Sequence, residues 1–133
     1  MATKMFLNIH VKNLEKSVAF FTELGFTFNP QFTDENATCM IVSEDIFIML
    51  LVENFFKGFT KKEICDTSKS AEAIIGLSFE SKEKVDEMVA KAVKAGATTP
   101  NPVQDHGHMY QHGFQDLDGH LWEIFWMDMS GVV

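Results

Sequence analysis

The chain has 133 residues, a formal net charge of −8 and a hydrophobic content of 46%. This length and composition fit one compact domain, or two small halves that share a core, better than several independent modules. Nucleic acids and anionic membranes are recognised by clustered Lys and Arg, which this acidic chain lacks. We therefore expect neither of these as a partner.

The cysteine content indicates a reducing compartment. Cys39 and Cys65 form no C-x-x-C pair, and two thiols are too few to stabilise a secreted domain of this size. The first residues lack the features of a signal peptide, and no apolar run approaches the length of a membrane span. We expect a cytoplasmic protein with both thiols reduced.

The order of predicted elements is the same in the two halves of the chain. The first half predicts a strand at 6–11, a helix at 13–25 and strands at 27–31, 38–43 and 46–52. The second predicts a strand at 74–79, a helix at 81–96 and strands at 97–99, 110–115 and 120–127. This is an α+β chain of two βαβββ modules, at about 4–53 and 72–128, with a linker at 54–71.

Both helices have clear start and stop signals. Asn13 and Ser81 are suited to the N-cap position, and Gly25 and Gly96 to a left-handed C-terminal stop. Each helix carries an apolar stripe that can cover one face of a sheet. The stripes comprise Leu14, Val18, Phe21 and Leu24 in the first helix and Val85, Met88, Val89 and Ala92 in the second.

Alternation along the strands assigns a second, mixed face to each sheet. In the first strand Leu7, Ile9 and Val11 are expected to pack under the helix, which leaves Phe6, Asn8 and His10 on the other face. The same argument leaves Ile74, Gly76 and Ser78 on that face in the second module. A mixture of polar and apolar side chains is typical of a ligand cavity. The 13 Phe and 8 Met favour a cavity that is mainly apolar.

The linker contains three aromatic residues, Phe55, Phe56 and Phe59, beside several Lys. Three Phe in a connection rarely face water alone. We expect the linker to pack on its own domain or on a dimer partner. The alternative is a lid over the cavity.

Three segments resemble the vicinal oxygen chelate superfamily, which includes glyoxalase I, extradiol dioxygenases and bleomycin or fosfomycin resistance proteins. They are "NIHVKNLEKSVAFFTELGF", "IIGLSFESKEKVDEMVAKAVKAGA" and the closing "FQDLDGHLWEI". The resemblance covers nearly the whole chain. It implies two βαβββ modules curled into a half-open mixed-sheet barrel around a cavity, a homodimer, and, in the metal-dependent members, a divalent ion on His and Glu ligands.

The family's metal-ligand positions are mostly apolar here. The resemblance places Phe6 and Ile74 at the two His positions, and Met49 and Glu123 at the two Glu positions. Hydrocarbon and thioether groups do not hold Mg²⁺, Mn²⁺, Ni²⁺ or Zn²⁺. We therefore expect no cofactor, and a divalent metal is disfavoured.

Glu123 is the candidate catalytic residue, since a carboxylate in a greasy pocket can serve as a general base or as a hydrogen-bond anchor. The alternative is a structural acid paired with His10, Asn8 or a backbone donor. The side chains expected to bind a ligand around it are Phe6, Asn8, His10, Met49, Ile74, His112 and Phe125.

The histidines leave several alternatives open. His106 and His108, with His112 or Glu123, could form a metal cluster outside the family positions, or be solvated loop residues. His112 shares a strand face with Phe114, which favours a pocket-lining role. His10 could accompany Glu123, or lie hydrated at the cavity rim.

The segment Asp116 to Gly119 has a turn composition and is expected to be structural.

Three functions remain in view. The residues favour a protein that binds a small, apolar or planar molecule in a metal-free pocket, with Glu123 as polar anchor. The second hypothesis is a glyoxalase-like lyase or isomerase, or a dioxygenase-type enzyme, that uses Glu123 with His10 or His112, with or without a divalent metal. The third is a structural or regulatory dimer whose cavity is filled by Phe6, Met49 and Phe125.

Overall fold

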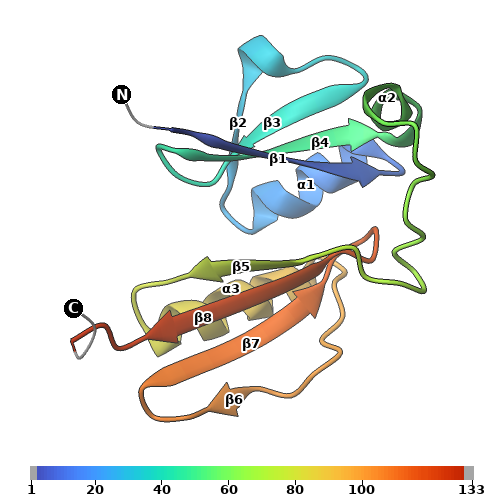
Figure 1. Cartoon of the computed structure of the whole chain (residues 1–133). Helices are drawn as coiled ribbons and strands as arrows, with labels where there is room; N and C mark the ends of the chain where they lie inside the picture. Colours follow the sequence, from blue (N-terminus) through green and yellow to red (C-terminus); the bar gives the residue numbers. More distant parts are fainter. Residues whose placement is uncertain (1–2, 131–133) are drawn as a thin grey trace. The chain divides into compact units, whose positions relative to one another are not determined.

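The computed structural model describes residues 3–130, which form two compact units, 3–65 and 66–130. Each unit has a four-stranded mixed sheet with one long helix packed against it (Figure 1). The two βαβββ modules expected from the sequence are therefore confirmed. None of the helices within 3–130 is long and apolar enough to cross a bilayer.

The first unit follows the predicted order with small shifts of boundary. Its elements are β1 (Met5–Val11), α1 (Leu14–Glu23), β2 (Thr27–Asn29), the 3₁₀ turn η1 (Pro30–Phe32), β3 (Ala37–Ile41), β4 (Ile46–Val52), the short helix α2 (Glu53–Phe56) and the 3₁₀ turn η2 (Lys57–Phe59). The predicted linker thus begins with two helical turns that belong to the first unit.

The second unit repeats this plan. Its elements are β5 (Ile74–Ser78), α3 (Lys82–Lys94), β6 (Gln104–Asp105), β7 (Met109–Gln115) and β8 (Leu121–Met127). The strand orders are β1-β4-β3-β2 in the first sheet and β5-β8-β7-β6 in the second. In both, the first strand is parallel to the last and the remaining pairs are antiparallel.

The predicted strand at 97–99 is wrong in position. Only Thr98 forms a bridge there, to Gln115, and the paired edge strand is β6, which lies further along the same neighbour, β7. Pro100 and Pro102 separate the bridge from the strand. Because proline has no N–H to donate to a ladder, a continuous edge strand through this segment is excluded.

The helix ends are confirmed as predicted. Asn13 Oδ1 accepts from the N–H of Lys16 at 3.0 Å, and Ser81 Oγ from the N–H of Lys84 at 3.1 Å. Gly25 and Gly96 have φ angles of +103° and +116°, which only glycine adopts without strain. The helices therefore start and stop where their own sequences direct them.

The core of each unit lies between its helix and its sheet. In the first unit it is formed by Ile9, Val11, Phe20, Phe21, Leu24, Met40, Ile48 and Leu50, and in the second by Ile75, Val85, Val89, Ala92, Phe114, Trp122 and Ile124. One face of each sheet therefore packs against the helix of its unit. The opposite face borders the pockets described below.

The turn before β8 is structural, as its composition predicts. Asp116 is buried, its Oδ1 accepts from the N–H groups of Asp118 and His120 at 2.9 and 3.0 Å, and its Oδ2 accepts from Trp122 Nε1 at 2.8 Å. Burial raises the pKa of Asp116, although His120 and these donors act in the opposite direction. This carboxylate links the turn to the core of the second unit.

Gly119 completes the same turn. Its φ is +87°, and a Cβ built on it would lie closer to the backbone oxygen of Thr67 than real side chains approach. Any side chain here would therefore collide with fixed backbone as well as strain its own.

We expect Gly119→Ala to lower the free energy of unfolding by about 2 kcal/mol or more, because strain and a backbone clash combine. Gly58→Ala is the matched control, since a Cβ at Gly58 meets nothing within 4 Å. Urea unfolding followed by circular dichroism measures both. Equal stabilities for the two variants would contradict this account of the turn.

We expect Asp116→Asn to lower the free energy of unfolding by about 2 kcal/mol. The NH₂ group of asparagine would replace a carboxylate oxygen that accepts a hydrogen bond, and it would face an N–H donor. Asp45→Asn, at a side chain that is 51% exposed, should change stability far less. Chemical denaturation of both variants tests this, and a loss that is the same for the two would show that burial of Asp116 carries no special weight.

Candidate functional site

Four of the predicted ligand-binding residues lie on the face of the first sheet that is turned away from its core: His10, which contacts Phe56, and a group of three others. Asn8 pairs with Met49 in the register of β1 and β4, and Phe6 lies two residues before Asn8. Residues directly opposite each other or two apart share a face, so these three side chains lie together.

A pocket of about 540 Å³ opens on this face and lies wholly within the first unit. That volume falls in the range of small-molecule sites. Its lining comprises Phe6, Asn8, Gln31, Phe32, Thr33, Asp34, Ala37, Met49, Leu51, Phe55 and Phe59. The residues come from three of the unit's strands, from the loop between β2 and β3, and from the helical turns after β4.

Aromatic rings dominate this pocket. Phe6, Phe32, Phe55 and Phe59 are between 39% and 63% exposed, which is unusual for four clustered Phe. Phe6 stacks on Phe47 with ring centroids 4.9 Å apart, and Phe55 meets Phe59 edge to face at 5.2 Å. The ring pairs hold two walls of the pocket in place before any ligand arrives.

The polar groups of the pocket have spare bonding capacity. Among residues 3–130, no side-chain hydrogen bond is made by the amides of Asn8 and Gln31. Asp34 Oδ1 accepts from the N–H groups of Asn36 and Ala37 at 2.8 and 3.1 Å, whereas its Oδ2 accepts no bond from the described residues. The pocket therefore offers a few polar anchors in an apolar surround.

The Phe-rich segment after β4 forms part of this wall. Phe55 and Phe59 line the pocket, whereas Phe56 contacts the ring of His10 edge to face, with centroids 5.5 Å apart. Phe56 therefore packs on its own unit, as predicted, whereas Phe55 and Phe59 are exposed at the pocket, a position that the lid alternative also fits. His10 is buried, so the expected hydrated position at a rim is wrong.

Glu123 occupies the corresponding position in the second unit. In the register of β5, β8 and β7 it lies between Gly76 and Gly113, as Met49 lies opposite Asn8 in the first unit. Its carboxylate is half-buried and makes no hydrogen bond or ion pair with any residue that the structure describes. The expected structural partner for Glu123 is therefore not present among those residues.

A second, smaller hollow of about 100 Å³ adjoins Glu123. Ile74 and Leu121 contribute apolar walls, and Gln104 and Gln111 contribute amides. Phe125 lies on the same strand face as Glu123, and its ring is 3.5 Å from where a Cβ on Gly76 would stand. The hollow admits a group of a few atoms.

Gly113, which pairs with Glu123 across β7 and β8, leaves the Glu123 carboxylate without a side-chain neighbour at that position, and the backbone explains why glycine is needed there. A Cβ at this position would lie 2.8 Å from the carbonyl oxygen of Trp122, closer than real side chains approach. The close contact between β7 and β8 therefore requires glycine, and the carboxylate has no side-chain neighbour across that pair of strands.

His112 faces away from Glu123. It pairs with Ile124, whose side chain lies in the core, and it lines a shallow hollow with Val89 and Val93 of α3. His112 also borders the hollow beside Glu123. His112 does share its face with Phe114, as predicted. It cannot assist Glu123 directly, because the two side chains project from opposite faces of one sheet.

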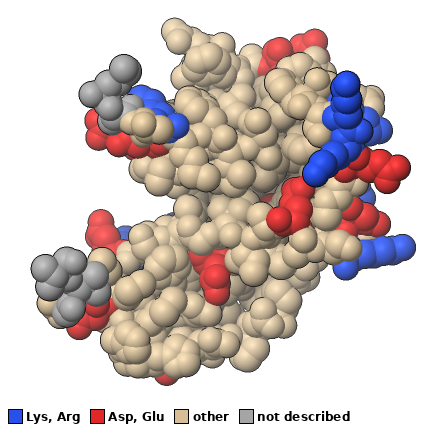
Figure 2. Space-filling model, in the orientation of Figure 1, with Lys and Arg blue, Asp and Glu red and all other residues tan. Residues whose placement is uncertain are grey.

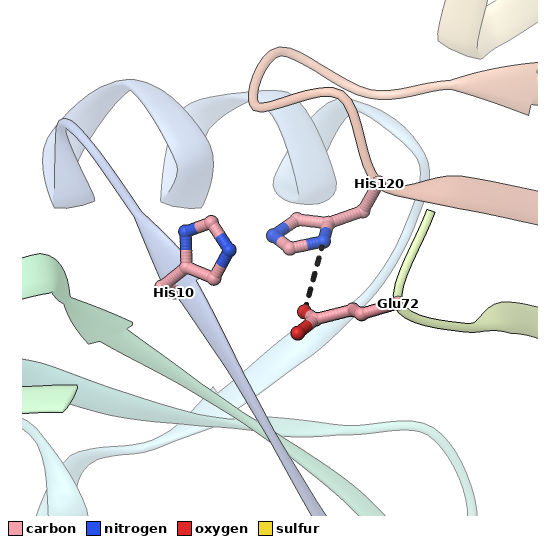
Figure 3. A group of neighbouring side chains, drawn as sticks. All are labelled: His10, Glu72 and His120. Carbon is pink, nitrogen blue, oxygen red and sulfur yellow. Dashed lines mark ion pairs between the residues drawn. The ribbon is translucent and has the colours of Figure 1, made fainter. Parts of the chain in front are cut away.

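The late histidines form no cluster of their own. His106 and His108 are exposed, and neither they nor His112 belong to any group of three metal-ligand side chains within residues 3–130. The hypothesis of a metal cluster in this loop is therefore wrong. His120 is instead buried, and its Nδ1 lies 3.8 Å from Glu72 Oε1, toward which it points (Figure 3).

The family's metal is not supported by the residues at its positions. Phe6, Met49 and Ile74 offer two hydrocarbon groups and a thioether, so Glu123 is the single hard ligand of the four. Such a set does not fit a divalent cation, and we derive no chemistry through one at these positions.

The structure separates the predicted site residues into two groups. Phe6, Asn8 and Met49 line the pocket of the first unit, and Ile74, His112 and Glu123 line the hollow of the second. Both spaces are open, which argues against a cavity filled by its own side chains. Broad areas of both units carry no charge, since charged groups lie mainly at the margins of the face drawn in Figure 2.

Six pocket residues escaped the sequence analysis, and two of them, Phe32 and Asp34, matter most for its chemistry; the others are Gln31, Thr33, Ala37 and Leu51. Phe32 and Asp34 lie between β2 and β3, where Asn29 Oδ1 accepts from the N–H of Gln31 at 2.9 Å and starts η1. The segment "NPQFTDEN" carried the signal, because Asn-Pro and Asp mark turns that can hold an outward-facing aromatic residue.

Comparisons with known proteins agree with this architecture. Residues 3–43 match the family model for the bleomycin resistance protein-like N-terminal domain. A search of curated proteins gives no significant match.

Several solved structures share the fold. A hypothetical protein from S. aureus is 28% identical, with 95% of each chain covered and a TM-score of 0.79. A glyoxalase/bleomycin resistance protein/dioxygenase family enzyme from Burkholderia phytofirmans is 17% identical, with 95% of this chain and 99% of that chain covered and a TM-score of 0.77. A protein of the same description from Nocardioides is 19% identical, with 98% and 87% covered and a TM-score of 0.72.

Residues 3–43 thus match the bleomycin resistance protein-like N-terminal family model, and the chain shares its repeated βαβββ fold with proteins described as members of the glyoxalase/bleomycin resistance/dioxygenase superfamily.

Proposed function

We propose that this protein binds a small, largely apolar and planar molecule in the pocket of its first unit. The observation that carries the proposal is the pocket of about 540 Å³ walled by four exposed Phe and Met49. Flat rings gain most by stacking on such walls, and the thioether adapts to their outline. The amides of Asn8 and Gln31, which make no side-chain hydrogen bond within residues 3–130, would orient the bound molecule.

The exposed aromatic surface of this pocket supports a binding role over a purely structural one, because its contact with water is unfavourable in free energy. Exposed aromatic clusters in water are unfavourable unless something covers them. The ring pairs Phe6–Phe47 and Phe55–Phe59 hold the surface open, so it does not collapse on itself. A preformed apolar pocket with few polar anchors is the usual form of a small-molecule site.

A homodimer in a reducing compartment completes this proposal. Met5 on the edge strand β1 and Ile46 beside it are 56% and 38% exposed, and edge strands with apolar side chains tend to find a partner. Neither Cys39 nor Cys65 forms a disulfide within the described part of the chain. Analytical ultracentrifugation over a range of concentrations tests the dimer, and a monomer throughout would refute it.

We expect the neutral fluorescent probe N-phenyl-1-naphthylamine to bind saturably, with one site per chain. Phe59→Ala should weaken binding by roughly fivefold, since one aromatic contact contributes about 1 kcal/mol. Met5→Ala is the control, because Met5 is about as exposed as Phe59 but lies outside the pocket lining. Equal affinity in the two variants would refute the pocket as the binding site.

A second candidate function is a glyoxalase-like enzyme that uses Glu123, and the bare carboxylate beside a hollow is the observation that favours it. A half-buried acid with spare lone pairs can accept a proton from a bound substrate. His112 is excluded as its direct partner by its opposite face.

We expect Glu123→Gln to abolish any isomerisation of the hemithioacetal of methylglyoxal and glutathione, because an amide cannot take up the proton. Probe binding in the first unit's pocket should stay unchanged in this variant, which controls for folding. Turnover that persists in Glu123→Gln, or none in the wild-type protein, would remove this candidate.

A further inference from the structure

Among the described residues that line the pocket of the first unit, Asp34 has the one charged side chain. Among the described residues that line it, none is a Lys, Arg or His. The chain as a whole carries a formal charge of −8. Both the local charge and the overall field therefore repel anions and attract cations.

The Asp34 carboxylate is fixed through one oxygen, and its second oxygen accepts no hydrogen bond from the described residues. Its Oδ1 accepts the two backbone N–H groups of Asn36 and Ala37, and this fixes the side chain in the loop after η1. Its Oδ2 makes no bond with residues 3–130. A ligand at the mouth of the pocket can therefore reach a carboxylate oxygen that is already oriented.

The fold does not need the negative charge at this position. The turn uses a single side-chain oxygen, which an asparagine would supply equally well. A carboxylate in place of an amide adds only charge to this local structure. The charge is therefore available for recognition.

The pocket walls favour a cation for a second, independent reason. The faces of aromatic rings carry negative electrostatic potential, and a cation placed over a Phe ring within about 6 Å is attracted to it. Phe6, Phe32, Phe55 and Phe59 present such rings around the space that Asp34 borders. We propose that the ligand of this pocket is a planar aromatic cation, stacked on the Phe walls and paired with Asp34; this deepens the proposed function and rests on it.

The test compares two ring systems that differ in little but charge. Acridine in mildly alkaline buffer is neutral, and 10-methylacridinium is its permanent cation. We expect the cation to bind the wild-type protein about three- to fivefold more tightly, as a partly exposed ion pair would provide. This preference should diminish as sodium chloride is added, because salt screens the pair.

Two matched variants locate the effect. Asp34→Asn keeps the oxygen that the turn requires and removes the charge, so it should abolish the preference for the cation, measured as the ratio of the two dissociation constants within the same variant. Glu35→Gln removes a neighbouring exposed charge that does not line the pocket, and it should leave the preference intact. Thermal unfolding confirms that each variant is folded.

The outcomes separate the two proposals. If acridine binds as tightly as 10-methylacridinium to the wild-type protein, and Phe59→Ala weakens both, the pocket is real and the cation proposal is overturned. If Asp34→Asn and Glu35→Gln reduce the preference equally, it reflects overall charge, and the role of Asp34 is overturned. If neither ring binds, both the proposed function and this inference fail.

Discussion

The parallel pairing of the first and last strands of each module determines the rest of this structure. β1 lies beside β4, and β5 beside β8, and a parallel pair can form only if the chain first crosses the sheet, here through α1 and α3. The register of these pairs places Met49 opposite Asn8 and Glu123 opposite Gly76. A slip of one residue would move each of these side chains to the other face.

The same register explains why the two modules differ in chemistry although they share a fold. Equivalent positions hold a thioether in the first unit and a carboxylate in the second. The first unit surrounds its position with aromatic rings, and the second with glycine and amides. One βαβββ plan thus presents an apolar pocket in one copy and a small polar hollow in the other.

The secondary structure was largely predictable because its signals are local. Caps at Asn13 and Ser81, glycines after both helices and alternation along β1 and β5 each depend on a few neighbouring residues. The edge strand β6 was misplaced because its position depends on where β7 can accept a partner after the two prolines, which local propensity does not reveal.

The site was predictable only in part, for a related reason. Alternation brought Phe6 and Asn8 to one face, but it could not show that His112 and Glu123 face opposite ways, since that depends on the pairing of β7 with β8. It also could not show that His10 is buried, because alternation gives a face and not what covers it. The position of Asp34 at the pocket was not predictable either, because it depends on the conformation of the loop between β2 and β3.

Gly113 has a consequence for how this protein can change over time. The carbonyl of Trp122 forbids a side chain at position 113, so the space beside position 123 is protected from being filled from that strand. A larger or differently charged residue at position 123 would meet little steric resistance from across the β7–β8 pair. A single codon change could therefore give the second unit new chemistry without repacking the sheet, which makes this position a natural starting point for divergence.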